Sequence, residues 1–224
     1  MCGRFALIVD ASVLADVFDV DPPREISPRF NIAPTQNVGI VRTGSQGDRE
    51  WATVRWGLVP SWAKDESIGA RMINARGETV AEKPSFRAAV KSRRCLIPAS
   101  GFYEWVKTGD GKQPHFIHFA DARPFAFAGL WERWSKGPEP LDSCTIITTA
   151  PNDLVAELHD RMPVILPPER YDEWLAPKPL SIDRLGELLV PHPAAEMEAY
   201  PVSTHVNRPG NDDPECIARS EATL

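Results

Sequence analysis

The 224-residue sequence lacks the segments that mark membrane-bound and exported proteins. No apolar run approaches the roughly 20 residues that cross a bilayer. Asp10 and Asp16 interrupt the short apolar stretch near the start, which is unlike a signal peptide, and no export segment precedes Cys2 to make it a lipid-anchor site. We therefore expect a soluble cytoplasmic protein with no membrane partner.

Cysteine and clustered metal ligands are also scarce. The four cysteines are Cys2, Cys95, Cys144 and Cys216, with no C-x-x-C spacing, and no Cys/His cluster has the spacing of a zinc site. Scattered thiols are typical of a reducing compartment, so we expect no disulfide and no metal. No glycine-rich phosphate loop is present, and we expect no organic cofactor.

Positive charge is in deficit as well. The formal net charge of −6 disfavours a protein that relies on general attraction to duplex DNA, so a nucleic acid would have to bind through a local basic patch. Proline, by contrast, is abundant. The 22 prolines predict many turns and short helices.

Short strands recur along the whole chain, with brief helices between them. Alternating or apolar runs predict strands at 5–9, 38–42, 51–56, 101–105, 115–119, 125–134, 143–149, 161–166 and 199–204. Helical spacing predicts helices at 11–18, 154–158, 167–175 and 182–189. A regular βαβ alternation, a linker and an internal repeat are missing. We expect one α+β domain, residues 2–224 after removal of Met1, with a barrel-like, strongly bent mixed β core and short peripheral helices.

Cys2 directly follows the initiator methionine, and its small side chain favours removal of Met1. The mature chain would then begin with an α-amine and a thiol on adjacent carbons. Such an amine has an ordinary pKa of about 8, and the thiol is a strong nucleophile. Together they can condense with an aldehyde to a Schiff base and close it to a five-membered thiazolidine. Taken alone, however, the position favours a small buried core residue.

Two side chains could move the protons of such a condensation. Glu104 stands between Tyr103 and Trp105, where burial would raise its pKa, although strand alternation could equally place it in solvent. His159 ends a predicted short helix, and histidine is the side chain best suited to proton transfer near neutral pH. Alone, such a histidine is more often a surface or capping residue.

Asn74 and Arg76 are candidates for contacts with a substrate. They lie two residues apart on a predicted extended segment and so face the same way. An amide beside a guanidinium suits a sugar hydroxyl and a phosphate, but a turn residue and a surface arginine explain the spacing as well. Trp62 lies among aromatic and basic residues, the composition of a platform for single strands, although tryptophans also fill cores.

Nine short motifs follow one another along the chain. They are MCGRF (1–5), FNIAPT (30–35), WGLVPSWA (56–63), INARGET (73–79), RCLIP (94–98), GFYEW (101–105), FAGLW (127–131), ITTAPN (147–152) and HDRMPVIL (159–166). In this order they closely resemble the SOS response-associated peptidase (SRAP) family. The resemblance runs from Cys2 to about Asn207 and covers nearly the whole chain.

The resemblance implies a barrel-like α+β domain with a positively charged groove. The implied function is to sense abasic sites in single-stranded DNA, including single-strand/double-strand junctions, and to form a covalent thiazolidine crosslink through Cys2 during the DNA damage response. The protein would be a monomer, associated with the nucleoid when bound to DNA. Each protein molecule would be consumed when it forms the adduct, or would release the DNA only slowly. The resemblance also implies peptidase, self-processing or lyase activity.

The family pattern also implies roles for individual residues. It makes Cys2 the nucleophile, Asn74 a sugar or phosphate contact, and Glu104 and His159 the acid–base groups. The implied DNA-binding residues are Arg4, Asn31, Trp62, Arg76 and Arg161. Two other functions remain open: a thiol hydrolase or peptidase in which the Cys2 amine is the base, and a non-catalytic single-stranded-DNA binding module with Cys2 buried.

Overall fold

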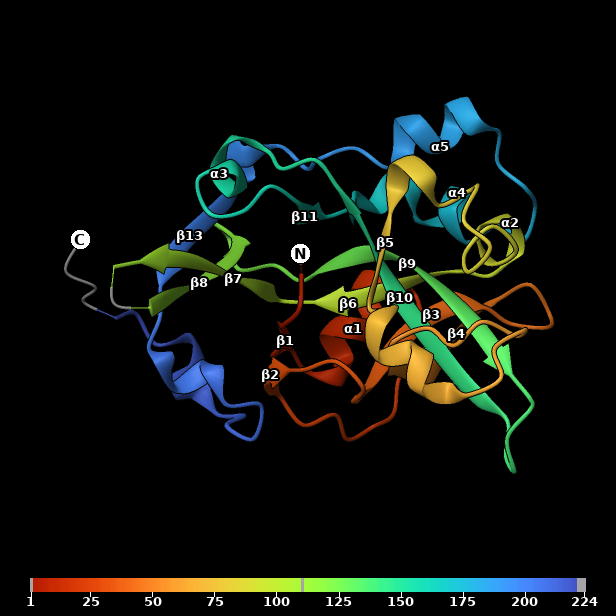
Figure 1. Ribbon diagram of the computed structural model, residues 1–224, viewed down its shortest axis with the longest axis horizontal. Coiled ribbons are helices and arrows are strands. Elements are labelled where there is room, and N and C mark those ends of the chain that lie inside the picture. Colours follow the sequence, from red (N-terminus) through yellow and green to blue (C-terminus); the bar gives the residue numbers. More distant parts are fainter. Residues whose placement is uncertain (1, 110, 221–224) are drawn as a thin grey trace.

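The computed structural model describes residues 2–109 and 111–220 (Figure 1). Met1, Asp110 and residues 221–224 lie outside the described part, and so do the predicted removal of Met1 and the end of the predicted domain. Within the described residues, every helix is too short or too polar to cross a bilayer.

A closed β-barrel forms the centre of the molecule. Its strands follow the ring order β4 (Arg49–Trp56), β3 (Asn37–Thr43), β6 (Arg94–Ala99), β9 (Phe125–Trp134) and β10 (Leu141–Thr149), and β10 pairs back with β4. Four of the pairs are antiparallel, whereas β10 and β4 run parallel. An odd number of strands cannot alternate in direction all the way round, so one parallel pair has to close the ring.

Three short strands extend the barrel. β5 (Asn74–Arg76) runs parallel to β10, with Thr148 in register with Arg76. β11 (Met162–Pro163) pairs with β10, whereas β12 (Ile165–Leu166) pairs with β9. Val164 lies between them and bonds to both neighbours, because its N–H donates to Ile147 and its carbonyl accepts from Ala128. The single strand predicted at 161–166 is therefore divided in two.

A second, antiparallel sheet carries the N-terminus. Its order is β13 (Met197–Pro201), β8 (Gly111–Phe119), β7 (Gly101–Thr108), β1 (Phe5–Leu7) and β2 (Arg29–Ile32). The ring of Phe5 packs edge-on against Trp56 at 5.2 Å and Phe127 at 5.7 Å between centroids. These contacts fix β1, and hence the residues just before it, against the barrel.

The helices are short and peripheral, as the prolines predict. They are α1 (Ala11–Phe18), α2 (Ala89–Ser92), α3 (Asp153–Ala156), α4 (Tyr171–Leu175) and α5 (Ile182–Leu188). The α3 helix begins where the Asn152 side chain accepts a hydrogen bond from the N–H of Val155, which satisfies a donor at the helix start. The 3-10 turns are η1 (Glu66–Arg71), η2 (Gly77–Thr79), η3 (Pro168–Arg170), η4 (Ala194–Glu196), η5 (Thr204–Asn207) and η6 (Pro214–Ile217).

The predicted fold class, α+β with a bent, barrel-like mixed β core and short outer helices, is confirmed. The strand predicted at 161–166 is divided in two, and the helix predicted at 167–175 begins as the 3-10 turn η3 before α4. Two further strands differ at their ends. The strand predicted at 5–9 stops at Leu7, and the strand predicted at 199–204 spans Met197–Pro201 because its pairing with β8 runs over those residues.

Candidate active site

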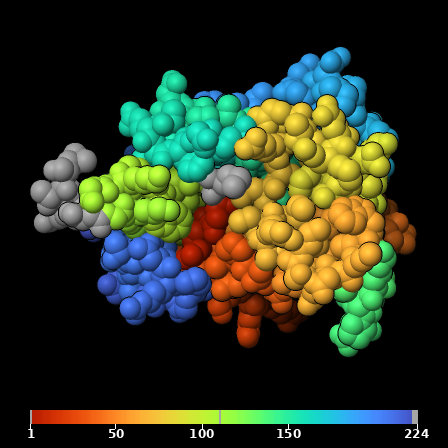
Figure 2. Space-filling view, in the orientation of Figure 1, coloured from red at the N-terminus to blue at the C-terminus, as the bar shows by residue number. Residues whose placement is uncertain are grey.

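Cys2 lies three residues before the start of β1, where β5 of one sheet bonds to the chain that enters the other. On the face shown in Figure 2, the red N-terminal residues reach the surface between the yellow-green residues of the β7–β8 hairpin, the blue C-terminal segment and orange residues from the first quarter of the chain. The Cys2 side chain itself is fully buried, and its Sγ lies 3.9 Å from the carbonyl oxygen of Arg4. A thiol in this position is held by its surroundings in one orientation.

Burial and a nearby carboxylate keep this thiol neutral. Loss of water raises the pKa of Cys2 well above its ordinary value, and the charge of Glu104 raises it further. Both side chains are buried, and the charge of Glu104 acts on Cys2. Cys2 is therefore not a free thiolate, and it needs a base at the moment when its sulfur reacts.

Asn74 reaches this space from β5. Its Nδ2 donates a hydrogen bond to the carbonyl oxygen of Cys2 at 2.8 Å. Its Oδ1 is buried and accepts no hydrogen bond from any described residue. Ala75 between Asn74 and Arg76 is buried against the barrel, which agrees with the predicted common face of Asn74 and Arg76. The amide thus offers one unused acceptor next to Cys2.

Glu104 enters from β7, the strand beside β1. Only 3% of the residue is exposed, so the structure settles the choice that strand alternation left open. Burial raises the pKa of Glu104, and the charge of His159 acts against that shift. A buried carboxyl with a raised pKa can both accept and return a proton near neutral pH.

His159 follows α3 and is half-buried. Its Nδ1 accepts the backbone N–H of Arg161 at 3.0 Å, which leaves the proton of a neutral ring on Nε2. The same nitrogen lies 2.8 Å from Oδ1 of Asp160, a contact that requires a proton on Nδ1. The two contacts therefore make opposite demands on Nδ1, and the Asp160 side chain, which is 87% exposed, can turn away from it.

The two arginines predicted to hold phosphates differ sharply in their surroundings. Arg76 is exposed, and its side chain makes no hydrogen bond or ion pair with the described residues. Arg161 is only 15% exposed and grips both carboxylate oxygens of Glu78, at 2.5 and 2.9 Å. Its Nη2 also donates to the carbonyl oxygen of Thr148 at 2.7 Å. Because Thr148 is in register with Arg76, the two arginines meet at the same point of the barrel.

Trp62 is one of the large apolar side chains that remain exposed. It is 51% exposed, and its Nε1 donates to the carbonyl oxygen of Pro84. The loop before it turns at Gly57, whose φ of 127° and whose approach to the Gly69 carbonyl leave no room for a side chain. This turn carries the chain from the buried Trp56 to the exposed Trp62.

Asn31 and Arg4 both contact the C-terminal segment, whereas the family pattern implies that they contact DNA. Asn31 is fully buried, and its Nδ2 lies 2.6–3.1 Å from the carbonyl oxygens of Val206, Arg208 and Asn211. Arg4 is half-buried and donates to Oδ1 of Asn31 and to the carbonyl oxygen of Val206. In this conformation both residues bind the C-terminal segment, and Asn31 has no surface for direct contact with DNA.

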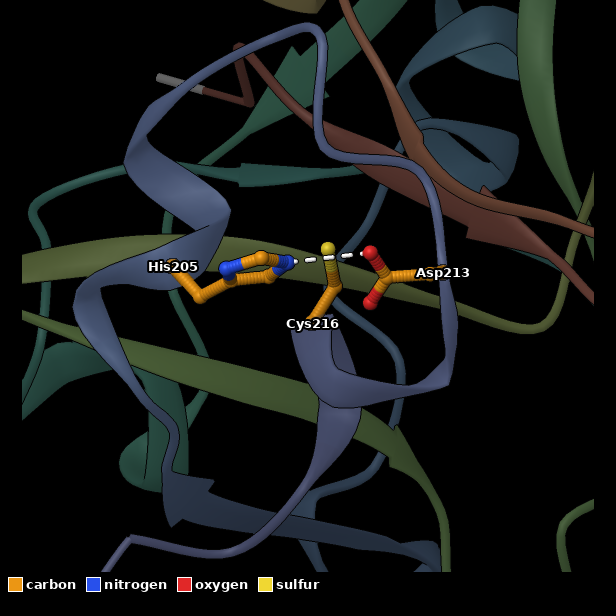
Figure 3. Close-up of side chains that lie close together, drawn as sticks. All are labelled: His205, Asp213 and Cys216. Atoms are coloured by element: carbon orange, nitrogen blue, oxygen red, sulfur yellow. Dashed lines mark hydrogen bonds and ion pairs between the residues drawn. The ribbon is translucent and has the colours of Figure 1, made fainter.

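A cluster of His205, Asp213 and Cys216 closes the C-terminal segment (Figure 3). Such donors can bind zinc, but their hydrogen bonds indicate another role. Nδ1 of His205 faces the Asn211 amide N–H, so the ring proton lies on Nε2 and points to Asp213 at 3.0 Å. A metal at Nε2 would place a proton on Nδ1 against that amide, whose orientation the His205 carbonyl fixes. The hydrogen bonds of His205 with Asn211 and Asp213 therefore stabilise the fold of the C-terminal segment.

Two features near the site were missed by reasoning from the sequence. One is Glu78, the partner of Arg161, although it stands inside the INARGET motif. Another is a shallow cavity of about 250 Å³ lined by Arg4, Trp105, Lys112 and Asn207. Its aromatic and basic residues come from segments far apart in the sequence, so no local pattern could reveal it.

Comparison with known proteins places this geometry in context. A family model described as SOS response associated peptidase (SRAP) matches residues 1–209. The chain is 50% identical over 224 residues to the abasic site processing protein YoqW of Bacillus subtilis, covering 97% of this chain and 99% of that protein. It is 34% identical to the abasic site processing protein HMCES of Gallus gallus, covering 99% of this chain and 78% of that protein.

Solved structures share the fold. A crystal structure of a protein from Bacteroides thetaiotaomicron superposes with a TM-score of 0.88 at 28% identity, covering 98% of this chain and all of the other. A second, from Bordetella bronchiseptica, gives a TM-score of 0.77 at 29% identity and covers 90% of this chain and all of the other.

Proposed function

The chain belongs to the SOS response associated peptidase (SRAP) family, and we propose that it processes abasic sites in single-stranded DNA by forming a covalent thiazolidine crosslink through Cys2. The observation that carries this proposal is the meeting of Cys2, Asn74 and Glu104 at one buried point where the two sheets join. A nucleophile, an acceptor for a hydroxyl and a proton carrier are what an aldehyde condensation requires.

The first stage joins the α-amine of a Cys2 freed of Met1 to the ring-opened deoxyribose. The amine nitrogen attacks the aldehyde carbon, and the carbonyl oxygen takes up a proton to give a carbinolamine. Loss of that oxygen as water leaves an imine. Glu104 suits the proton transfers of this stage, since its raised pKa lets it donate as an acid and accept as a base. His159, whose charge acts on Glu104, suits the second acid–base role of this stage.

The second stage closes the ring. The Cys2 thiol loses its proton as the sulfur bonds to the imine carbon, and the imine nitrogen gains one proton. The product is a thiazolidine, and the whole reaction releases one water. A buried thiol with a raised pKa stays protonated until this step, and Glu104 is the nearby carboxylate that can receive the proton. Without ring closure, water could hydrolyse the imine.

The remaining residues would hold the strand. The unused Oδ1 of Asn74 suits a deoxyribose hydroxyl, and Arg76 and Arg161 suit the flanking phosphates. Trp62 offers an exposed ring for a stacked base. For Asn31 and Arg4 we propose a supporting role, since both hold the C-terminal segment beside β1.

Several finer properties belong to the same proposal. The protein acts as a monomer in the cytoplasm, at the nucleoid when bound to DNA, and it accepts single-strand/double-strand junctions. Its adduct is durable or slowly reversible, so that the lesion is shielded from strand scission. The testing experiment is a denaturing gel of the Met1-free protein with a single-stranded abasic oligonucleotide. A shifted band with the wild type and none with Cys2→Ala supports the proposal, and no band with either overturns it.

A further inference from the structure

The paired contact between Arg161 and Glu78 has the shape of a phosphate contact. Both Nη atoms of Arg161 donate to the two carboxylate oxygens of Glu78, at 2.5 and 2.9 Å. A guanidinium binds a phosphate through the same fork of parallel N–H groups. While Glu78 occupies this fork, a DNA phosphate cannot take the same place.

Packing explains why Glu78 reaches Arg161 from a distant part of the sequence. Glu78 lies in η2, the turn that directly follows β5. A Cβ on the preceding Gly77 would come within 3.3 Å of Leu189 and 3.4 Å of the Thr148 carbonyl, so glycine lets this turn lie close to β10 without displacing Leu189. The same Thr148 carbonyl accepts a hydrogen bond from Arg161. The turn that carries Glu78 and the Arg161 side chain thus both lie against Thr148.

The two partners differ in how freely they can separate. The Arg161 side chain is 15% exposed and is also bound to Thr148, whereas the Glu78 side chain is 51% exposed. The hydrogen bonds from Arg161 lower the pKa of Glu78, so the carboxylate is charged at neutral pH. Glu78 can therefore swing into water and remain solvated while Arg161 stays in place.

We propose that Glu78 is a positioning residue that occupies the guanidinium of Arg161 in the DNA-free protein and gives way to a DNA phosphate in an exchange of carboxylate for phosphate. This inference rests on the proposed function, because it takes Arg161 as a phosphate contact. Arg76, exposed and open, is met first by an incoming strand. Binding at Arg161 then competes with Glu78, which weakens the hold on intact strands that offer no aldehyde to Cys2.

The exchange makes a quantitative prediction for Glu78→Gln. The variant should bind an intact single-stranded oligonucleotide about two- to fivefold more tightly at low salt, the gain that removal of one partly exposed ion pair allows. Its log–log dependence of affinity on salt should steepen by up to about 0.7, the slope for one phosphate contact on a single strand. Glu78→Asp keeps the charge but shortens the reach, and should fall between Glu78→Gln and the wild type.

A matched control and a second background separate this exchange from a general effect of charge. Glu50→Gln changes the net charge equally and also removes a carboxylate from an arginine, Arg42. Glu50 is also far from the candidate site. Trp56, whose Nε1 donates to the carbonyl oxygen of Ile73 just before Asn74, lies at the opposite end of β4, about 20 Å from Glu50 along the strand. In an Arg161→Ala background, Glu78→Gln should bring no more gain than Glu50→Gln.

The experiment is fluorescence anisotropy with an intact labelled oligonucleotide across a salt series, together with adduct formation on an abasic oligonucleotide. Tighter binding by Glu78→Gln that exceeds the Glu50→Gln control and disappears without Arg161 supports the exchange. Equal or weaker binding than the control, or a gain that still exceeds the Glu50→Gln control in the Arg161→Ala background, overturns it. If the wild type forms no adduct at all, the proposed function fails, whatever the binding of Glu78→Gln.

Discussion

The Asn74 amide nitrogen donates to the Cys2 carbonyl oxygen at 2.8 Å, and this bond joins β5 of the barrel to the residue that precedes β1 of the second sheet. The bond fixes the direction of the Cys2 backbone and therefore the position of the amine that would become the N-terminus. It also leaves the Asn74 Oδ1 without a partner among the described residues, next to the place where a sugar would enter.

Replacing Asn74 by Ala should slow adduct formation. The change removes a hydrogen bond that orients Cys2, and a bond of this kind contributes about 0.5–1.5 kcal/mol. The expected loss is between about twofold and tenfold in the single-turnover rate on an abasic oligonucleotide. Binding to an intact oligonucleotide serves as the control, because it should change less than the rate. An unchanged rate would show that the bond does not position the amine.

Glu104→Gln should have opposite effects on stability and on rate. Because burial raises the pKa of Glu104 in the folded state, the folded protein holds this proton more tightly than the unfolded chain. Stability from this group is complete below the pKa of the unfolded chain and is lost as the pH rises through the folded pKa. Removing the charge should therefore raise the melting temperature more at pH 8 than at pH 5.

The expected gain for Glu104→Gln at pH 8 is about 2–4 °C, the shift that about 1 kcal/mol gives in a domain of this size. Adduct formation should meanwhile slow by at least about a hundredfold, the contribution typical of a general acid–base group. Thermal melts at the two pH values and single-turnover rates measure both. If Glu104→Gln raised the melting temperature less at pH 8 than at pH 5, the result would contradict a buried carboxyl with a raised pKa.

Arg76→Ala should weaken DNA binding evenly across sequences. Its exposed guanidinium has no side-chain partner among the described residues, so it can neutralise a phosphate at once. Loss of one contact should reduce the log–log slope of affinity against salt by about 0.7. Anisotropy with two oligonucleotides of different sequence, at several salt concentrations, checks this. An unchanged affinity at every salt concentration would show that Arg76 does not contact the DNA.

Asn31→Ala should destabilise the protein without weakening the contact of the folded protein with DNA. The fully buried amide satisfies carbonyl groups of the C-terminal segment, and leaving such groups unpaired costs about 2 kcal/mol. The melting temperature should fall by about 4–8 °C. Affinity for an oligonucleotide, measured well below that temperature, should match the wild type. A large loss of affinity under conditions in which the variant is fully folded would show that Asn31 contributes to DNA binding.

Much of the fold follows from local patterns in the sequence. The helix at 11–18 and the strand at 125–134 are found with their predicted ends, because each has a clear period and a firm stop. The pairing of strands is a different matter. No local pattern shows that β10 closes the barrel by pairing in parallel with β4, since those strands are far apart in the sequence.

The site was predictable in its parts but not in its arrangement. Strand periodicity placed Asn74 and Arg76 on one face, and the structure agrees. Spacing could not decide whether Glu104 was buried, because that depends on β1 packing beside β7. Nor could it show that Arg161 is held by Glu78, 83 residues earlier, or that Asn31 faces the C-terminal segment. These contacts arise only when distant segments meet.

The most direct test of the central claim is the intact mass of the Met1-free protein after reaction with a single-stranded oligonucleotide that carries one abasic site. The account predicts a species equal to the two masses minus one water, stable to denaturation without a reducing agent. Cys2→Ser, which keeps the amine but lacks the thiol, should give a stable adduct only after borohydride reduces the imine to an amine, and that product is heavier by two hydrogens. No adduct with the wild type, or an equally stable one with Cys2→Ser, would contradict thiazolidine formation at Cys2.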